Sequence, residues 1–474
     1  MIILGTNSIK DTGFNVDNSV RLDGSSSYMT KSMGTPTNID KYSFSFWVKR
    51  SKLGVQQSIF RSTNGAASND SHVTFQADDT LRFEEYGGSA SIGKLQTTQV
   101  FRDISAWYSI LLVYDSGNGT AGNRMRMYVN GTEVTAFGTD NNPSQNADSY
   151  FNRSGETLSF GRTPYSGGGN YFSGYVAELV MCDGQALTPT DIGEFDEDSG
   201  IFKPINVSGL TFGNNGFYLD FEDSSNLGND ANGGTDLTES NLTATDQTTD
   251  TCTNNFATLN PLQTDHSGNT SFSEGNNKFQ ATTGDWVGTA STQGTNTGKW
   301  YAEFKLSTLT TSALIGVATD VYMSDRGVTD FVGFTSGLSN YAYAKYLTGV
   351  VDANEGKIRD QSQTYNSYGS NTGGSTGDII GVALDLDNNK LYFSVNGTWE
   401  NSGDPAGNSN GYTIGAGTYQ FGVWGYQSTS EANFGNPSFT ISSGNTDANG
   451  YGNFEYAVPS GYFSLNTKNL AEYG

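Results

Sequence analysis

The chain contains only two histidines, His72 and His266, so a hydrolase with a histidine base would have to use one of them. His72 lies in "SNDSHVTF", where a loop enters an expected strand, and His266 lies in the polar stretch "QTDHSGN". Neither histidine has a nucleophile motif beside it. The sequence therefore does not favour a Ser-His-Asp or Cys-His hydrolase.

Acidic residues that alternate along a segment are the other candidates for catalysis, because glycosidases use two carboxylates about 5–10 Å apart. In "GEFDEDSG", Glu194, Asp196 and Asp198 alternate, but the preceding "LTPTDI" indicates the end of a short helix and a loop. Glu84 and Glu85 are adjacent, and adjacent residues of a strand point to opposite faces. We therefore expect no enzyme activity. A polysaccharide-degrading enzyme stays the alternative.

Two tyrosine-rich segments are candidates for sugar binding, because aromatic faces together with Asn and Asp hydrogen bonds suit sugars. "TPYSGGGNYF" carries Tyr165 and Tyr171 in what the sequence indicates is an exposed loop. In "GLSNYAYAKYL", we expect the alternation to place Tyr341, Tyr343 and Tyr346 on one face. A half-buried strand explains the second segment equally well, so both interpretations stay open.

Short strands and tight turns must position these residues. "YSFSFWVKR" alternates between apolar and other side chains, and "WYSILLVYD" is a nearly continuous apolar run, as in a central strand. "RMRMYVNGTEV" and "KLYFSVNGTWE" each place Asn-Gly between alternating segments, which predicts a hairpin with a type I′ turn. The 60 glycines and the 13% aromatic content fit many short strands rather than long helices. The predicted fold class is all-β.

Charge excludes some partners. Asp and Glu number 49 against 25 Lys and Arg, which gives a net charge of −24. Such a surface repels phosphate backbones, so we expect no binding to free nucleic acid. The chain has no long apolar run, and its start, "MIILGTNSIKD", has no basic region. We therefore expect no secretory signal and no membrane insertion.

The first region resembles a laminin-G-like, concanavalin A-like jelly roll. The landmarks occur in order: "RLDGSSSYM", "YSFSFWVKR", "WYSILLVYDS" with "RMRMYVNG", and "FSGYVAELVMCDGQAL". We assign residues 1–221 to this jelly roll. In jelly rolls of this kind a structural ion often joins an early "DG" turn to a late loop, so the resemblance implies a calcium site with Asp23 and Asp183 as ligands, helped by Ser26. No other cofactor is implied.

The second region resembles a SPRY domain, another bent β-sandwich. "GKWYAEFKL", "IGVAT", "GDIIGVALDLDNNKLYFSVNGTWE", "FGVWGY" and "NFGNPSF" follow the strand order of that family. We assign residues 277–438 to a SPRY-like sandwich, residues 222–276 to a long polar connector, and residues 439–474 to a tail packed on the sandwich or on a partner. The prediction is thus two β-sandwich domains joined by a connector.

The chain combines the jelly roll, a connector that begins "GFYLDFEDSSNLGNDANGG", the SPRY-like domain and the ending "NFEYAVPSGYFSLNTKNL". This arrangement resembles virion proteins of marine tailed bacteriophages. The resemblance implies a virion surface component, such as a tail fibre, a spike or a head decoration, located on the virion and made in the host cytoplasm. Its expected partners are host-surface glycans or other virion proteins of the capsid or tail. We expect a homo-oligomer, and a trimer if the protein is a fibre. A purely structural protein that joins capsid or tail subunits is a further alternative.

Overall fold

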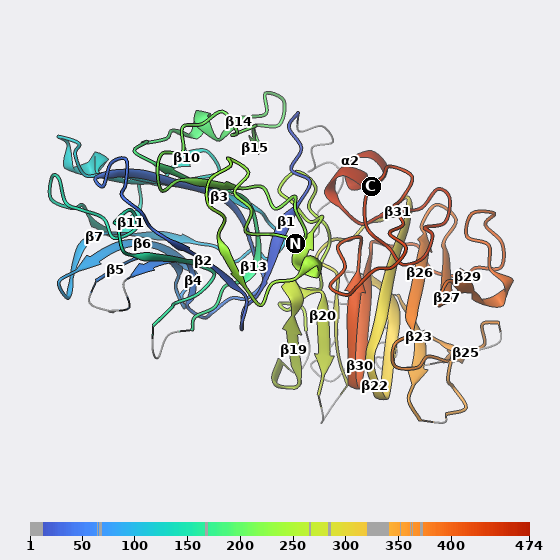
Figure 1. Ribbon diagram of the computed structural model, residues 1–474. Helices are drawn as coiled ribbons and strands as arrows, with labels where there is room; N and C mark the ends of the chain where they lie inside the picture. Colours follow the sequence, from blue (N-terminus) through green and yellow to red (C-terminus); the bar gives the residue numbers. More distant parts are fainter. Residues whose placement is uncertain are drawn as a thin grey trace. The chain divides into compact units, whose positions relative to one another are not determined.

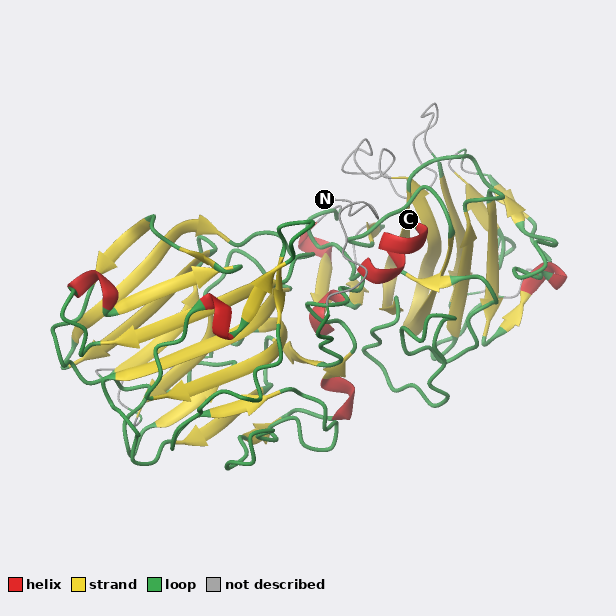
Figure 2. Cartoon of the chain, turned by 90° about the horizontal axis from the view of Figure 1, so that it is seen from above, coloured by secondary structure: helices red, strands yellow, loops and turns green. Residues whose placement is uncertain are grey.

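The computed structural model describes residues 13–63, 65, 69–165, 169–264, 267–282, 286–319, 341–350, 352–360, 362, 364–369 and 373–474. The chain divides into two compact units, Thr12–Thr253 and Asn254–Gly474, which we call the N-terminal unit and the C-terminal unit. Strands dominate both units, and helical segments are short (Figure 2). The all-β fold class predicted from the sequence is confirmed.

The N-terminal unit consists of two antiparallel sheets (Figure 1). The strands of sheet A are, in spatial order, β10 (Thr132–Glu133), β9 (Met125–Val129), β8 (Tyr108–Asp115), β3 (Lys41–Arg50), β13 (Ser173–Asp183), β1 (Ser19–Asp23) and β18 (Gln247–Thr248), with β16 (Phe217–Leu219) also paired to β13. The strands of sheet B are, in spatial order, β11 (Phe137–Asn141), β7 (Ala90–Val100), β6 (Thr80–Gly87), β5 (Asp70–Phe75), β4 (Gln57–Thr63), β12 (Thr157–Phe160), β2 (Tyr28–Ser32) and β17 (Thr238–Ser240).

Smaller elements complete this unit. They are the ribbon of β14 (Gly193–Phe195) and β15 (Phe202–Pro204) and the 3₁₀ helices η2 (Ala121–Asn123), η3 (Pro189–Asp191) and η4 (Ala244–Asp246).

Strand β8 shows why the apolar run in "WYSILLVYD" is continuous. Ile110 and Leu112 lie in the core between the two sheets, whereas Leu111 and Val113 lie in a second cluster on the other side of sheet A. That second cluster includes Leu187 and other residues from the segments after β13. A strand that is buried on both faces needs apolar residues at every position.

The two Asn-Gly hairpins form as predicted. Asn130 and Gly131 join β9 to β10, with φ of 48° and 75°. Asn396 and Gly397 join β27 (Lys390–Val395) to β28 (Thr398–Trp399), with φ of 47° and 77°. A type I′ turn requires positive φ at both central residues, which Asn and Gly tolerate best.

The structure divides the predicted connector between the two units, at residues 253 and 254. Within residues 222–253, β17 pairs with β2, β18 pairs with β1, and Leu227 and Leu237 lie in the core of the N-terminal unit. Residues 254–276 belong to the C-terminal unit, where Ala257 and Leu259 are buried. A few apolar anchors suffice because polar side chains satisfy the backbone locally, as Asp223 does for Ser225. The average composition of the segment does not reveal these anchors.

The C-terminal unit is built on one 13-stranded sheet. Its main path runs through β19 (Thr270–Ser273), β20 (Lys278–Ala281), β30 (Tyr419–Asn433), β22 (Lys299–Thr319), β23 (Ala342–Thr348), β24 (Ile358–Asp360) and β25 (Tyr365–Asn366). The strands off this path are β21 (Val287–Ala290), β26 (Ile379–Asp385), β27, β28, β29 (Tyr412–Thr413) and β31 (Phe463–Ser464). The helical segments are η5 (Ser267–Asn269), η6 (Glu274–Asn276), η7 (Glu400–Ser402) and α2 (Thr467–Tyr473).

The long strand β22 belongs to both halves of this sheet. Residues 299–305 pair with β26, residues 312–318 pair with β23, and β30 pairs along most of the strand. The register with β30 shifts twice between these halves, and such bulges bend a strand. The C-terminal tail packs on this unit, because β31 pairs with β22 and Leu470 of α2 is buried in the core.

Candidate functional site

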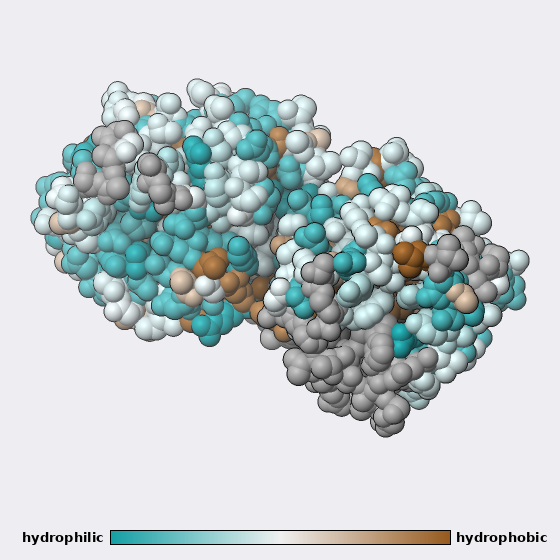
Figure 3. All heavy atoms as spheres, turned by 90° about the horizontal axis from the view of Figure 1, so that it is seen from below, coloured by the Kyte–Doolittle hydropathy of each residue, from teal (hydrophilic) through white to brown (hydrophobic). Residues whose placement is uncertain are grey.

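The outer face of sheet B is polar, although its inner face forms half of the core. Successive side chains of a strand point to opposite faces. In β5, Val73 and Phe75 lie in the core, so His72 and Thr74 point outward. Figure 3 shows the N-terminal unit from the side of this sheet, where the visible surface is mostly hydrophilic. The outward side chains of sheet B are therefore polar, in contrast to those of its inner face.

A single row of polar side chains crosses the eight strands on the outer side of sheet B, and its central members Ser159, Arg61, His72 and Glu84 are buried, with at most 7% of each exposed. The row has one residue from each of the eight strands, and paired neighbours share a register position. We call this set the polar row, and its members in spatial order are Thr238, Thr30, Ser159, Arg61, His72, Glu84, Lys94 and Asn141. Strands lie about 4.8 Å apart, so the row spans about 34 Å. Each member has a side chain with a hydrogen-bond donor or acceptor.

The centre of the polar row is a network of charges. Arg61 Nη2 lies 2.5 Å from Asp70 Oδ2, and His72 Nδ1 lies 3.2 Å from Asp70 Oδ1. On the other side of the ring, His72 Nε2 lies 3.3 Å from Glu84 Oε2. Lys94 Nζ lies 3.7 Å from the same Glu84 oxygen. The carboxylates of Asp70 and Glu84 therefore lie on either side of His72, with Arg61 beside Asp70 and Lys94 beside Glu84.

This network keeps Glu84 ionised. Burial alone would raise its pKa, but the hydrogen bond and charge of His72, the charge of Lys94 and a hydrogen bond from Ser91 outweigh the burial. The pKa of Glu84 falls to about 2. The carboxylate is thus an acceptor at any physiological pH and is not a proton donor. Because both ring nitrogens of His72 face carboxylates, neither nitrogen is open toward a substrate.

The predicted residues Tyr165 and Tyr171 lie beside this row. Both come from the segment after β12, and the Arg61 guanidinium lies 4.8 Å from the centre of the Tyr165 ring. The Arg162 guanidinium lies 3.4 Å from the centre of the Tyr28 ring, and the Tyr28 and Tyr171 rings are 6.5 Å apart. Aromatic rings held by arginines are rigid surfaces for stacking. The structure thus brings the two tyrosines to the polar face.

The other members of the site were not identified from the sequence. Arg61, Asp70, Glu84 and Lys94 lie on four strands, and each looks like an ordinary outward residue of an alternating segment. In the sequence, His72 stands out only as a possible catalytic base. The one signal available is that charged residues recur at outward positions of consecutive strands. His266, the second histidine, lies outside the described residues.

The predicted tyrosine face in the C-terminal unit is wrong. Tyr341 and Tyr343 are stacked, with ring centres 6.2 Å apart, but Tyr346 packs with Ala342 and Ala344 in a different cluster. An odd separation of three residues along β23 places Tyr346 on the face opposite to Tyr343. Tyr343 and Tyr346 are also buried, with 6% and 7% of their surfaces exposed. They therefore do not form a three-ring surface.

The predicted calcium site is also contradicted. Asp23 pairs with Ser173 at the start of β13, and Asp183 is the last residue of that 11-residue strand. The two carboxylates are therefore separated by about 30 Å along the strand, too far to share an ion.

Both carboxylates are occupied by protein donors. Asp23 accepts hydrogen bonds from the three serines of its own turn, and these bonds and the turn's backbone N–H groups lower its pKa although burial opposes them. Asp183 accepts from the backbone of Thr37, Asn38 and Asn215. In the described parts of the chain, no group of three or more His, Cys, Asp or Glu side chains is placed to hold a metal ion.

The acidic segment after η3 forms a short ribbon rather than a loop. Glu194 lies in β14 opposite Lys203 of β15. Lys203 Nζ lies 3.3 Å from Glu194 Oε1 and 3.7 Å from Asp196 Oδ1. These carboxylates are on the surface and share one cation. The expectation that Glu84 and Glu85 point to opposite faces is confirmed, since Glu85 is fully buried and accepts from Tyr42 Oη at 2.5 Å.

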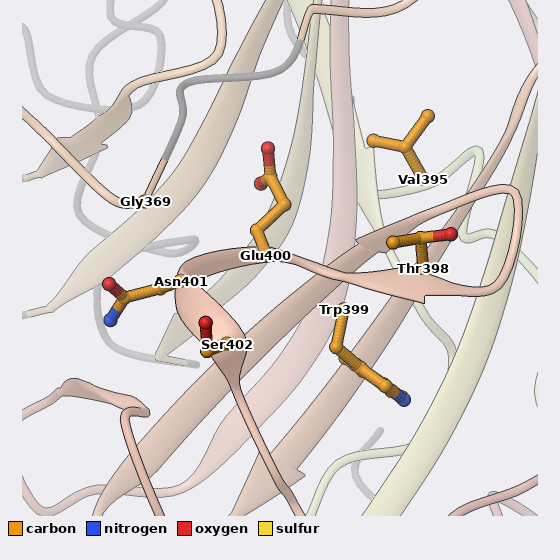
Figure 4. A pocket seen from close by; sticks show the side chains of 7 residues that line it. All are labelled: Gly369, Val395, Thr398, Trp399, Glu400, Asn401 and Ser402. Atoms are coloured by element: carbon orange, nitrogen blue, oxygen red, sulfur yellow. The ribbon is translucent and has the colours of Figure 1, made fainter.

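A pocket of about 650 Å³ lies in the C-terminal unit (Figure 4). Its lining residues are Gly369, Val395, Thr398, Trp399, Glu400, Asn401 and Ser402. Glu400 Oε2 accepts a 2.6 Å hydrogen bond from Lys345 Nζ, and both side chains are buried. Figure 4 shows Trp399 and Glu400 leaving the chain in opposite directions, so the ring and the carboxylate do not face each other. The Glu400 carboxylate is therefore already bonded to a group of the protein.

Among the helices that the structure describes, none is long and apolar enough to cross a membrane.

Comparison with known families identifies the N-terminal unit. The family model Laminin_G_3, described as the concanavalin A-like lectin/glucanases superfamily, matches residues 23–193. This segment is therefore a concanavalin A-like jelly-roll domain, as its motifs predicted. No curated protein matches the chain.

Three solved structures are similar to parts of this chain at low identity. A native heptameric SAP-like pentraxin from Limulus polyphemus is 18% identical and covers 36% of this chain and 78% of its own, with a TM-score of 0.29. The SPRY domain of human HERC1 is 13% identical and covers 37% of this chain and 96% of its own, with a TM-score of 0.27. A protein from Bacteroides ovatus ATCC 8483, described as a proposed carbohydrate-binding protein, is 16% identical and covers 48% of this chain and 58% of its own, with a TM-score of 0.32.

Proposed function

We propose that the outer face of sheet B binds a carbohydrate chain and that the protein acts by adsorption, without covalent chemistry. The observation that carries the proposal is the polar row, which crosses all eight strands beside the rings of Tyr28, Tyr165 and Tyr171. Hydroxyl, amide and charged groups suit sugar hydroxyls, and the rings suit the apolar faces of sugars. The exposed ends of the row, Thr238 and Asn141, are about 34 Å apart, a distance that fits a polymer better than a single sugar.

The match of residues 23–193 supports this proposal, because that superfamily is named for lectins and glucanases. The state of His72 favours binding over catalysis. A histidine whose two nitrogens face Asp70 and Glu84 has neither nitrogen free to exchange a proton with a substrate.

We further propose that this binding serves a virion surface component, such as a tail fibre, a spike or a head decoration, in a homo-oligomer that is trimeric if it is a fibre. The resemblance of the whole chain to phage virion proteins supports this role. A shallow site with millimolar Kd contributes only about −4 kcal/mol. Several copies on one particle would raise the avidity by roughly 10²–10⁴.

A glycan array probed with the full chain tests the binding. We expect binding to polysaccharides, and we expect Tyr165→Ala and Tyr171→Ala each to weaken it by roughly three- to tenfold, since each ring contributes about 1 kcal/mol. Tyr341→Ala, the same change in the C-terminal unit, is the matched control and should leave affinity unchanged. Loss of binding in Tyr341→Ala alone would move the site to the C-terminal unit.

Two further measurements separate the alternatives. We expect no release of reducing sugar from the bound polysaccharides. Release that disappears in Glu194→Gln or Asp196→Asn would identify a polysaccharide-degrading enzyme. An array without any signal, together with tight binding to purified virus particles, would favour a purely structural role among capsid or tail proteins.

A further inference from the structure

We propose that the ligand of this face is an acidic polysaccharide, one that carries carboxylate or sulfate groups. The inference rests on the proposed function and specifies its ligand. Across the chain, acidic residues outnumber basic ones by 49 to 25. On the outer face of sheet B the ratio is reversed. Four side chains there are arginine or lysine, namely Arg61, Arg82, Lys94 and Arg162, and two are acidic, Asp70 and Glu84.

The carboxylates of Asp70 and Glu84 are both engaged in contacts within the protein. Asp70 accepts from Arg61 Nε at 2.7 Å and also contacts His72. Glu84 Oε2 contacts His72 at 3.3 Å, while Arg82 Nη1 and Lys94 Nζ lie farther from it, at 3.8 and 3.7 Å. One carboxylate cannot neutralise both Arg82 and Lys94. The two carboxylates thus hold the network together, and a net positive charge remains on this face.

The surplus charge lies on Arg82 and Lys94. At 3.7 and 3.8 Å their contacts with Glu84 are longer than hydrogen bonds. Arg82 donates through Nε and Nη2 to the side chain of Gln96, which is neutral. Both side chains are half-buried, with 23% of each exposed, so they are reachable and partly shielded from water. An anionic group between them would gain two charge-assisted hydrogen bonds.

A second surplus cation lies across the same face. Arg162 lies over the ring of Tyr28, and its Nε is buried without a hydrogen-bond partner among the described residues. Strand β7, which carries Lys94, and strand β12, which precedes Arg162, are four strands apart, or about 19 Å. Cationic sites at this separation, joined by hydroxyl groups and aromatic rings, match a polymer that bears an anion on every few sugars.

A neutral polysaccharide explains these cations less well, because unpaired arginines and lysines contribute little to the binding of uncharged hydroxyls. Nucleic acid is the other common polyanion. The net charge of −24 repels a dense phosphate backbone, whereas a sparsely charged sugar polymer is repelled less.

Matched pairs of polymers test the proposal with the full chain. The probes are polygalacturonate with its methyl ester, and dextran sulfate with dextran. We expect at least one acidic member to bind roughly tenfold or more tightly than its neutral counterpart. We also expect its affinity to fall as salt rises, since ionic strength screens exposed charges. This salt dependence is measured on the unmodified protein, so it does not depend on any variant folding.

Variants locate the effect. Lys94→Gln and Arg82→Gln should each reduce affinity for the acidic polymer by roughly tenfold, because each removes a charge-assisted hydrogen bond. Lys41→Gln changes the net charge equally in sheet A, beside Asp115, and should have no effect. Circular dichroism checks that each variant is folded. Equal losses in all three variants would show a general charge effect and overturn the assignment to this face.

The remaining outcomes separate this inference from the proposed function. Equal affinity for acidic and neutral polymers would overturn the acidic ligand and leave carbohydrate binding intact. Absence of binding to these four polymers and to every sugar on the array would overturn both. Binding of a single-stranded DNA oligonucleotide as tightly as the acidic sugars would show a general polyanion site and overturn the assignment to a polysaccharide.

Discussion

Glu84 and Glu85 are neighbours in β6, yet their carboxylates lie on opposite faces of sheet B and their pKa values shift in opposite directions. Glu84 lies in the polar row, where His72 and Lys94 help to lower its pKa to about 2 against the effect of burial. Glu85 is buried in the core, and desolvation raises its pKa although Ser71, Tyr42 and Ser149 donate hydrogen bonds to it. Glu84 thus lies on the outer side of sheet B, and Glu85 belongs to the core.

Glu84→Gln should remove an acid-sensitive part of the stability. The folded pKa of Glu84 lies below its ordinary value of 4.5, so its contribution is complete above pH 4.5 and is lost as pH falls toward about 2. Denaturant unfolding at a series of pH values measures the difference in the free energy of unfolding between wild type and variant. We expect this difference to shrink over that range.

Glu85→Gln is the matched comparison, one residue away. Because the folded pKa of Glu85 is raised, its protonation favours the folded state, and stability is lost as pH rises above 4.5. The difference in free energy of unfolding between wild type and Glu85→Gln should therefore change with pH in the direction opposite to that for Glu84→Gln. The same sign in both variants would contradict the assignment of the two faces.

The free energy of unfolding of the wild type should fall as Glu178 ionises near neutral pH, and Glu178→Gln should abolish this fall. Glu178 lies in the bulge of β13 with φ of 49°, and it accepts a 2.8 Å hydrogen bond from Tyr218 Oη. Burial, and secondarily the charges of Asp220 and Glu222, raise its pKa to about 7, although the Tyr218 hydrogen bond opposes this. Stability is complete below pH 4.5 and declines as pH rises through 7, by about 3 kcal/mol in all.

Unfolding of the wild type and of Glu178→Gln at pH 4 and pH 8 measures this effect. From pH 4 to pH 8, the free energy of unfolding of the variant should rise by about 3 kcal/mol relative to that of wild type. Glu194→Gln, the same change at a surface position, is the control. An unchanged difference between pH 4 and pH 8 in Glu178→Gln would contradict the raised pKa.

Glu400→Gln should destabilise the C-terminal unit by about 3–5 kcal/mol, because it leaves Lys345 as a buried charge without its partner. Desolvation already lowers the pKa of Lys345, and Glu400 opposes that effect. The double change Lys345→Met with Glu400→Leu removes both charges and should cost much less. Hydrogen exchange of β23 amides measures the C-terminal unit separately. Equal losses in the single and double variants would show that packing, and not charge, is decisive.

Calcium should not stabilise the N-terminal unit. The oxygens of Asp23 and of Asp183 already accept hydrogen bonds from neighbouring donors. The Tm should be the same in excess Ca²⁺ and in EDTA, since an ion that does not bind the folded state does not change its stability. Asp183→Asn should lower the Tm equally in both conditions. A rise of several degrees with Ca²⁺, absent in Asp183→Asn, would show a calcium site at Asp183.

Local features of the sequence determined the strands, the two Asn-Gly turns and the opposite faces of Glu84 and Glu85, because each depends on residues next to one another in the chain. The same rule, applied correctly, also separates Tyr343 from Tyr346. The family motifs predicted a jelly roll within residues 1–221, and the family model matches residues 23–193.

The tertiary structure alone decided which distant residues meet. The order of strands in sheet B brings Thr30, Arg61 and Thr238 into one row, although up to 208 positions separate them along the chain. It also places Asp23 beside the first residue of β13, whereas Asp183 is the last residue of that strand. Alternation fixes the face on which a side chain lies, but register between strands fixes its neighbours. Register depends on the packing of the whole core, which no short segment contains.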